Sequence, residues 1–146
     1  MTNTFNRNDG TFAQVDYASV SGNPALTSLT KATTADITLS TTSYFDGPAV
    51  SQGSSGTWFA SGTVTLLSSA GFPNYFAKLW DGTTVIASAA TDPGAINFWI
   101  TISLSGVLAS PAGNLRISVA SSVASKILFN ASGNSADSVI TAVRIG

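Results

Sequence analysis

The sequence predicts an all-β protein in which about eight antiparallel strands pack as a β-sandwich or barrel. Three observations favour this fold class. From about residue 35 onward, apolar and polar residues alternate in short runs. Gly, Pro, Asn and Asp separate those runs at intervals of roughly 8–15 residues, and no long stretch keeps a helical period. The length of 146 residues suits one domain with a short arm beside it.

Residues 1–34 are expected to form an extended N-terminal arm. Three isolated aromatic residues, Phe5, Phe12 and Tyr17, stand among Asn, Asp, Thr and Ser. The arm has too few apolar residues to fold alone, so a disordered tail is the alternative. Docked on a partner, the three aromatic side chains would serve as separate anchors. We therefore expect the arm to attach the domain to a larger assembly.

The first strands of the domain are expected at 37–39 and 58–66. In the second of these, Trp58, Ala60, Val64 and Leu66 share one face. The segments between them, Gly47-Pro48 and residues 52–56, are typical of loops because they are rich in Gly, Pro and Ser.

A hairpin is expected from residues 75–80 and 83–89. Between them stands Asp81-Gly82, a pair preferred in type I′ turns, whose two central residues have positive φ. Asp92-Pro93-Gly94 predicts the next turn.

The second half of the domain contributes four further alternating runs, at 96–104, 115–119, 127–131 and 138–145. The first of them is the cleanest alternation in the chain. Only residues 104–110 leave room for a short helix.

Large apolar side chains fall on the nominal outer faces of these strands, which favours a subunit interface. Phe76, Trp80 and Trp99 lie opposite the inward positions of their runs. The final strand is apolar on both faces, with Val139, Val143 and Ile145 on one face and the other two expected interface residues, Ile140 and Ala142, on the other. These last two and the three aromatic residues are the expected interface. A one-residue bulge that returns the aromatic side chains to the core is the alternative.

Composition argues against catalysis. The chain has no His, no Cys and no Glu, and charged residues make up 9% of it with a net charge of −1. This excludes His-based triads, thiolate chemistry and Cys/His zinc sites, and it gives no basic footprint for nucleic acid. We expect no catalytic, metal-binding or cofactor-binding residues. Neither a secretory signal nor an apolar run long enough to span a bilayer is visible.

The best carboxylate pair for a glycosidase is Asp81 with Asp92, but turn chemistry accounts for both. Calcium is equally disfavoured, because Asn8-Asp9-Gly10 and Asp46-Gly47 lack a loop with several Asp residues. Lys78, between Phe76 and Trp80, suits either a cation–π contact or a solvated position. Trp80 suits either stacking on a sugar ring or burial in an interface.

Three segments carry a resemblance to a known family: residues 57–65 (TWFASGTVT), 77–88 (AKLWDGTTVIAS) and 140–145 (ITAVRI). Together they resemble small bacteriophage structural proteins with a jelly-roll domain of the C1q/tumour-necrosis-factor type, over about residues 35–146. The resemblance implies a jelly-roll β-sandwich at 35–146 that forms a homotrimer, with the final strand near the three-fold axis. That family includes fibre tips, head fibres and capsid decoration proteins, and no catalytic residue transfers from it.

The expected function is therefore that of a phage virion structural protein. A trimeric capsid decoration or head-fibre protein on the particle surface, assembled in the host cytoplasm and held to the major capsid protein by its arm, fits best. One alternative is a tail-fibre or receptor-binding module that recognises host surface glycan. Another is a carbohydrate-binding module.

Overall fold

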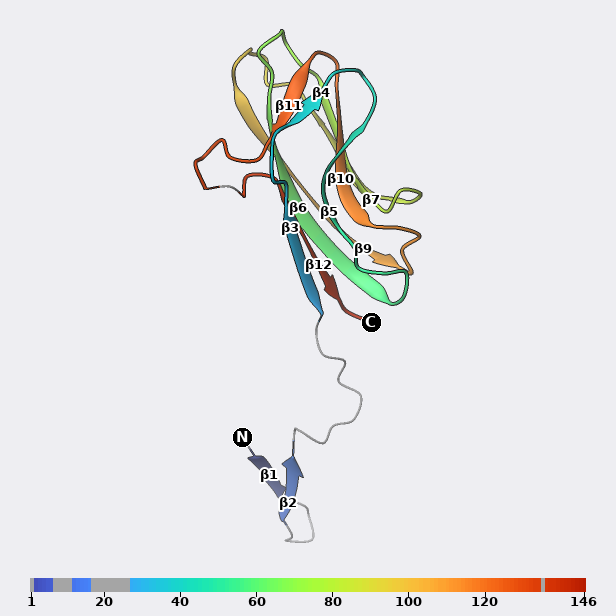
Figure 1. Ribbon diagram of the computed structural model, residues 1–146. Coiled ribbons are helices and arrows are strands. Elements are labelled where there is room, and N and C mark those ends of the chain that lie inside the picture. The colour runs from blue at the N-terminus through green and yellow to red at the C-terminus, as the bar shows by residue number, and fades with distance from the viewer. Residues whose placement is uncertain (1, 7–11, 17–26, 135) are drawn as a thin grey trace.

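The computed structural model describes residues 2–6, 12–16, 27–134 and 136–146, and within these it contains strands and no helix. No helix in the described ranges is therefore long and apolar enough to cross a membrane. The strands are β1 (Thr2–Asn6), β2 (Phe12–Asp16), β3 (Ser28–Ala32), β4 (Ile37–Leu39), β5 (Phe45–Val50), β6 (Thr57–Leu67), β7 (Tyr75–Trp80), β8 (Val85–Thr91), β9 (Trp99–Ala109), β10 (Leu115–Ser121), β11 (Ser125–Leu128) and β12 (Val139–Arg144). Strands β3 to β12 form a jelly-roll sandwich of two antiparallel sheets (Figure 1).

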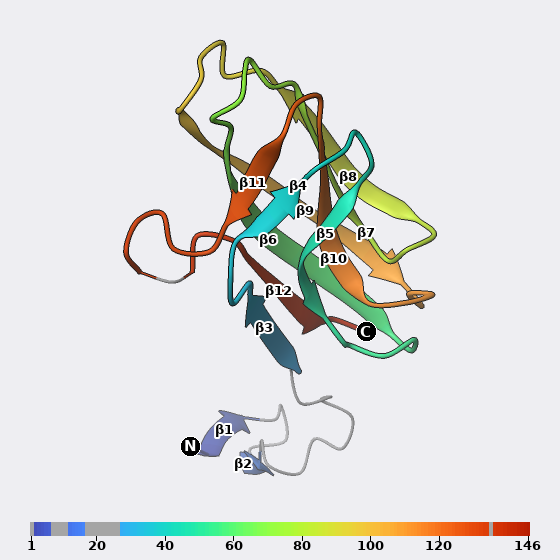
Figure 2. The ribbon, with the colours of Figure 1, turned by 45° about the horizontal axis from the view of Figure 1, so that its top comes forward.

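The larger sheet has six strands and is organised around β6. Along one edge, β6 pairs with β9 over its whole length, from Thr57 opposite Ala109 to Leu67 opposite Trp99. Its other edge is shared, because β12 pairs with residues 58–63 and β11 with residues 65–67. Strand β3 then pairs with β12, and β4 with β11. The smaller sheet has four strands in the order β5-β10-β7-β8 (Figure 2).

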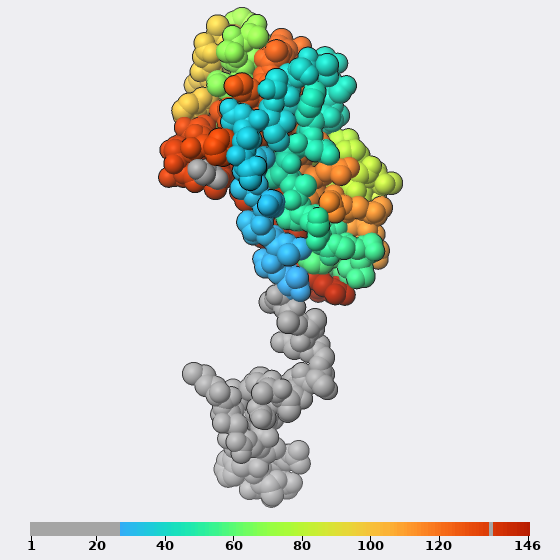
Figure 3. All heavy atoms as spheres, in the orientation of Figure 1, coloured from blue at the N-terminus to red at the C-terminus, as the bar shows by residue number. Residues whose placement is uncertain are grey.

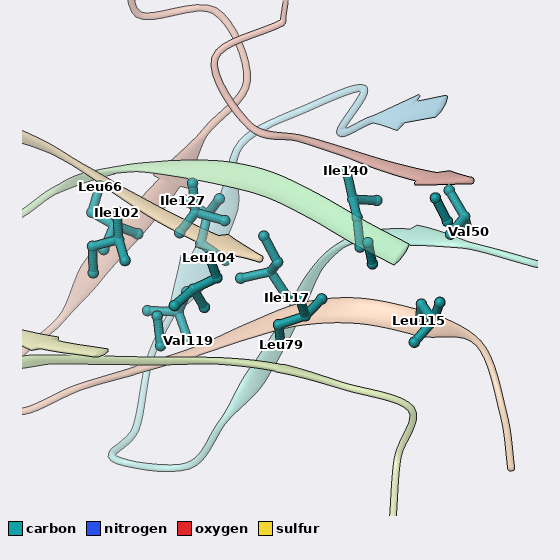
Figure 4. Close-up of a cluster of buried hydrophobic side chains, with 14 of the residues drawn as sticks. Val50, Leu66, Leu79, Ile102, Leu104, Leu115, Ile117, Val119, Ile127 and Ile140 are labelled. Carbon is teal, nitrogen blue, oxygen red and sulfur yellow. The ribbon is translucent and has the colours of Figure 1, made fainter. Parts of the chain in front are cut away.

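The core lies between the two sheets and is built from alternate residues of each strand. Leu66 of β6 and Ile140 of β12 point inward from the larger sheet, and Leu79 and Ile117 meet them from the smaller one (Figure 4). Burying one such side chain contributes roughly 1.5–3 kcal/mol. This packing holds the outward residues of both sheets in fixed positions.

Strands β5 and β3 were not expected from the sequence, because β5 contains a Gly-Pro pair and β3 is a short, mostly polar run. Gly47-Pro48 lies inside β5, where the register against β10 shifts between Arg116 and Ser118. This bulge takes up the proline, and β5 is an edge strand, so the missing N–H of Pro48 removes no bond within the sheet. The loop expected at these two residues is therefore a strand.

The jelly-roll sheet also begins earlier than the expected boundary at residue 35. Residues 28–32 form β3 and pair with β12 from Ala32 opposite Val139 to Ser28 opposite Val143. The last residues assigned to the arm thus belong to the domain.

Within the rest of the expected arm, β1 and β2 form an antiparallel hairpin in place of one extended segment. Phe5 lies in β1 and Phe12 in β2, while Tyr17 lies outside the described residues.

Other boundaries shift by a few residues. Strand β9 begins at Trp99 and continues to Ala109, so residues 104–109 are strand and no short helix lies at 104–110. Strand β11 ends at Leu128, before the expected limit of 131. The expected hairpin joins β7 to β8, but Trp80 pairs with Val85 and only Gly82 has positive φ in the turn. The turn is therefore a four-residue loop and not the expected type I′ turn.

Candidate functional site

The outer face of the six-stranded sheet carries no charged side chain on β3, β6, β9 or β12. Cross-strand pairing identifies the outward positions, because paired residues share a face. We call this surface the uncharged face. Its central members are Phe59, Ser61, Thr63, Ser103, Ser105, Val107, Val139, Thr141 and Val143.

An apolar row crosses the uncharged face. Phe59 of β6 pairs with Val107 of β9 on one side and with Val143 of β12 on the other. Phe59 is 40% exposed and Val107 is 53% exposed, so the row is open to solvent in the single chain. Ile145, also exposed, follows β12 and donates its backbone N–H to Thr57 at 2.8 Å.

The next row of the uncharged face consists of hydroxyl groups. Ser61 pairs with Ser105 and Thr141, and Thr141 pairs with Thr30 of β3. The Oγ1 atoms of Thr30 and Thr141 are hydrogen-bonded at 2.9 Å. Hydroxyl groups that bond to one another cost less to dehydrate than charges, so this surface is suited to burial.

The structure distributes the five expected interface residues over three places. Ile140 and Ala142 have no exposed surface and pack in the core, so neither is available to a second chain, and the expectation for these two is corrected. The outward residues of β12 are Val139, Thr141 and Val143.

The expected aromatic members of the interface lie on outer faces, but of different sheets. Phe76 and Trp80 belong to the four-stranded sheet, while Trp99 lies at one end of β9 beside Leu67. Their roles in an interface stay predictions. Phe59, which the sequence analysis passed over, was detectable as an outward member of the run at 58–66, whereas Val107 lies beyond the run expected at 96–104.

The outer face of the four-stranded sheet has a different chemistry. Its members are Tyr44, Asp46, Phe76, Lys78, Trp80, Arg116 and Ser118, and we call this surface the aromatic–cation face. Phe76, Lys78 and Trp80 are alternate residues of β7, and Arg116 and Ser118 lie opposite the last two on β10.

A chain of polar contacts holds the Trp80 ring in place. Trp80 Nε1–H donates to Ser118 Oγ at 2.6 Å, and Ser118 Oγ–H donates to Asp46 Oδ1 at 2.6 Å. Asp46 Oδ2 lies 3.3 Å from Arg116 Nε, and the Arg116 guanidinium lies 4.8 Å from the centroid of the Trp80 ring. The four residues therefore form a closed network.

Lys78 sits between two aromatic rings. Its Nζ atom lies 3.3 Å from the centroid of the Trp80 ring and 4.3 Å from that of Tyr44. The cation–π contact considered from the sequence is present. Because Lys78 and Arg116 both lie over the Trp80 ring, that ring is less open to stacking on a sugar than the sequence suggested.

The two carboxylates considered for glycoside hydrolysis lie at opposite ends of β8. Asp81 precedes this seven-residue strand and Asp92 follows it, which separates them by about 23 Å. Glycosidase carboxylates are roughly 5–10 Å apart. No group of three potential metal-ligating side chains occurs among the residues described.

Asp81 has the structural role that turn chemistry predicts. Its Oδ1 accepts the N–H groups of Thr83 at 2.8 Å and Thr84 at 2.6 Å, and its Oδ2 accepts that of Ala112 at 2.7 Å. Burial alone would raise the pKa of Asp81, but these N–H donors outweigh it and hold the pKa below its ordinary value. Asp92 likewise accepts the N–H of Gly94 at 2.8 Å.

The surface also has a groove between the edge strands β3 and β5, which lie side by side in the view of Figure 3. Two adjoining hollows of about 420 and 350 Å³ share Lys31 and Ala49 in their lining. Among the described strands, β3 pairs only with β12 and β5 only with β10, so each has one edge here that no described strand covers.

No protein-family model and no curated protein sequence matches this chain. Among solved structures, it is similar to the tumour-necrosis-factor protein Eiger of S. frugiperda, with a TM-score of 0.57 and 12% identity over 83% of this chain and 93% of that one. It also matches the C-terminal CBM6 domain of the laminarinase LamC from Zobellia galactanivorans, with a TM-score of 0.42 and 15% identity over 81% of this chain and 100% of that one. A third match is the infectious bursal disease virus Gx strain, with a TM-score of 0.45 and 10% identity over 95% of this chain and 41% of that one. The likeness to Eiger concerns the fold, and with the strand order it confirms the expected jelly roll.

Proposed function

We propose that this chain is a structural protein of a bacteriophage particle, a capsid decoration or head-fibre protein whose jelly-roll domains associate as a homotrimer. The observation that carries the proposal is the uncharged face. Phe59 and Val107 of its apolar row are open in the single chain, and five of its six other central positions outside that row carry hydroxyl groups, with Val139 the exception. Removing water from such a surface costs little free energy because it carries no charge, and burying its apolar side chains is favourable.

A structural role agrees with the chemistry of the chain. It has no His, Cys or Glu, and the buried carboxylate of Asp81 is fully engaged by backbone N–H groups. General acid–base and nucleophilic catalysis need a titratable group within reach of a substrate. We therefore assign the chain no enzymatic activity, no metal and no cofactor.

Attachment to the particle is assigned to the residues that precede β3. Phe5 and Phe12 lie in the strands of the β1–β2 hairpin, and Tyr17 follows them in the sequence. Aromatic residues give a large contact area at a small entropic cost, which suits anchors. Three copies in a trimer would combine weak contacts into stable attachment to the major capsid protein.

The test of the trimer is its mass in solution, measured by sedimentation equilibrium. We expect the wild-type chain to be trimeric and Phe59→Asp to be monomeric and folded, because a carboxylate cannot be buried unpaired in a dry contact. Phe76→Asp is the comparison, since Phe76 is similarly exposed on the outer face of the other sheet, and it should stay trimeric if the uncharged face alone forms the interface, whereas a monomer would support the interface expected at Phe76 from the sequence. A monomeric wild type would overturn the proposal. If the Phe59→Asp variant stays trimeric, the uncharged face is not the trimer interface.

A further inference from the structure

We propose that the aromatic–cation face binds an acidic oligosaccharide, one whose sugars carry carboxylate or sulfate groups. This function is separate from the structural role above and does not depend on the oligomeric state. It rests on four features of the face: an ammonium group without a carboxylate partner, exposed aromatic rings beside it, a fixed framework beneath it, and an adjoining polar hollow.

The first feature is the charge of Lys78. Of the described carboxylates, none lies within 4 Å of Lys78 Nζ, whereas Arg116 is paired with Asp46 and Lys126 with Asp36. The rings of Tyr44 and Trp80 stabilise the cation but supply no anionic acceptor. Two cations and one carboxylate leave the face with one excess positive charge, in a chain whose net charge is −1. An anionic group on a ligand would complete this arrangement.

The second feature is the pair of exposed rings. Tyr44 is 46% exposed and Phe76 is 45% exposed. The residues that pair with Phe76 on either side are Ala120 and Ala90, whose small side chains leave the phenyl ring uncovered. Flat aromatic rings offer apolar area to the C–H face of a sugar. From Phe76 to Trp80 the face extends about 13 Å along β7, which suits an oligosaccharide better than a single sugar.

The third feature is rigidity. Ser118 is fully buried between Trp80 and Asp46, and both of its hydrogen bonds measure 2.6 Å. All the strands that carry these residues belong to one sheet with paired backbones. A site that is already ordered loses little conformational entropy when it binds a ligand.

The fourth feature is a hollow of about 220 Å³ next to Phe76. Asn74 and Asp92 contribute polar groups to its lining. An amide and a carboxylate can bond to sugar hydroxyl groups, while the carboxylate repels an anionic substituent. The hollow thus fits a neutral part of the saccharide, with the charged part at Lys78.

Other macromolecules fit this face less well. Nucleic acid needs a dense basic surface, and here there are two cations. A peptide cannot extend the sheet at β7 or β10, because both strands are already paired along both edges.

The experiment follows the three indole N–H signals of Trp58, Trp80 and Trp99 by NMR during titration. The probes are tetragalacturonate, tetrasialate and a sulfated galactan tetrasaccharide, each compared with its methyl-esterified or desulfated form. We expect at least one acidic probe to move the Trp80 signal and leave those of Trp58 and Trp99 in place. We expect the neutral forms to bind at least about tenfold more weakly, because each lacks the charged group that would form a hydrogen bond with Lys78.

The test variants are Lys78→Met, which keeps the apolar stem and removes the charge, and Phe76→Ala. The first should weaken binding roughly ten- to hundredfold, and the second roughly three- to tenfold. Lys126→Met, on β11 of the other sheet, is the matched control and should change affinity less than about twofold. The same samples are checked by sedimentation, so that a failure to form trimers is detected separately.

Three results would each overturn the inference. The first is that no acidic probe moves the Trp80 signal at millimolar concentration. The second is that the neutral forms bind as tightly as the charged ones. The third is that Lys126→Met weakens binding as much as Lys78→Met does.

Discussion

The two sheets pack on one core, but their outer faces differ in charge and in how firmly neighbouring groups hold the side chains in place. On the uncharged face, Phe59 and Val107 are open to solvent, Val143 is half-buried, and the polar positions are hydroxyl groups. On the aromatic–cation face, Lys78, Arg116 and Asp46 are held among aromatic rings by short contacts. A surface without charges costs little free energy to dehydrate when another protein covers it. Charged groups held in fixed positions instead bind most strongly to a ligand of opposite charge.

This contrast shows that one alternating pattern can serve two purposes within a single sandwich. Inward residues of both sheets are similar Leu, Ile and Val side chains, so the core does not distinguish the two faces. The outward residues alone do so. The four predictions that follow probe this contrast in order of decreasing effect.

The largest effect is expected from a comparison of two positions on opposite faces of β12, Ile140 and Val143. Ile140→Asp places an unpaired carboxylate in the core, where Ile140 is fully buried, and should abolish folding by lowering stability by more than about 4 kcal/mol. Val143→Asp lies on the outward side of the same strand and should leave the monomer folded while preventing association. Circular dichroism and sedimentation separate the two outcomes. Similar behaviour of both variants would contradict the assigned strand orientation.

Removal of N-terminal residues should distinguish the arm from the sheet. A chain that starts at Thr27 retains β3 and should fold with little change in thermal stability. A chain that starts at Thr33 loses five pairs with β12 and the Thr30–Thr141 hydrogen bond, and should lose several kcal/mol. Urea denaturation measures both. Equal stability of the two chains would show that β3 contributes nothing to the stability of the larger sheet.

Asp81→Ala should destabilise the end of the four-stranded sheet by about 2–3 kcal/mol at pH 7, because three backbone N–H groups lose their acceptor. The folded-state pKa of Asp81 is lowered from 3.8, so the carboxylate stabilises the fold above about pH 3.8 and this contribution disappears as pH falls through the lower, folded value. The difference between variant and wild type should therefore shrink in strong acid. Urea denaturation over a pH series checks this, and a difference independent of pH would refute it.

Ser118→Ala should have the smallest effect on stability, about 1–2 kcal/mol, because it leaves Trp80 Nε1–H and Asp46 without their shared partner. It should also broaden or shift the Trp80 indole signal, since the ring loses one of its restraints. Ser105→Ala, on the uncharged face, is the comparison and should stay within about 0.5 kcal/mol of wild type. An unchanged Trp80 signal would show that the network does not hold the ring.

Much of the fold was predictable from the sequence where strands alternate strongly. Strands β6, β7 and β10 lie close to their expected positions, because their inward Leu, Val and Ile residues recur every second position. Strand β3 (SLTKA) has too little alternation to be recognised, and its partner β12 is more than 100 residues away in the sequence. Strand β5 was hidden by its Gly-Pro pair, which marks a bulge here and not a loop.

The candidate surfaces were predictable only in part. The contact between Lys78 and Trp80 follows from their spacing on one strand, and it was one of the two alternatives that the sequence left open for Lys78. Asp46 and Ser118 join the same network from β5 and β10, and pairing between distant strands cannot be read from local pattern. On β12, both faces are apolar, and the alternation did not say which of them the core would occupy.

The position of β12 between β3 and β6 also constrains the order in which the chain can fold during synthesis. Strand β3 emerges early but has no partner until residues 139–144 have been made, because it pairs with β12 and not with β6. Until then, β6 has β9 on one edge, and much of its other edge waits for β12. The apolar row through Phe59 and Val143 is consequently assembled last. Until β12 has been made, the unpaired edges of β3 and β6 can pair with other chains, so the incomplete sandwich is more prone to aggregation than the finished one.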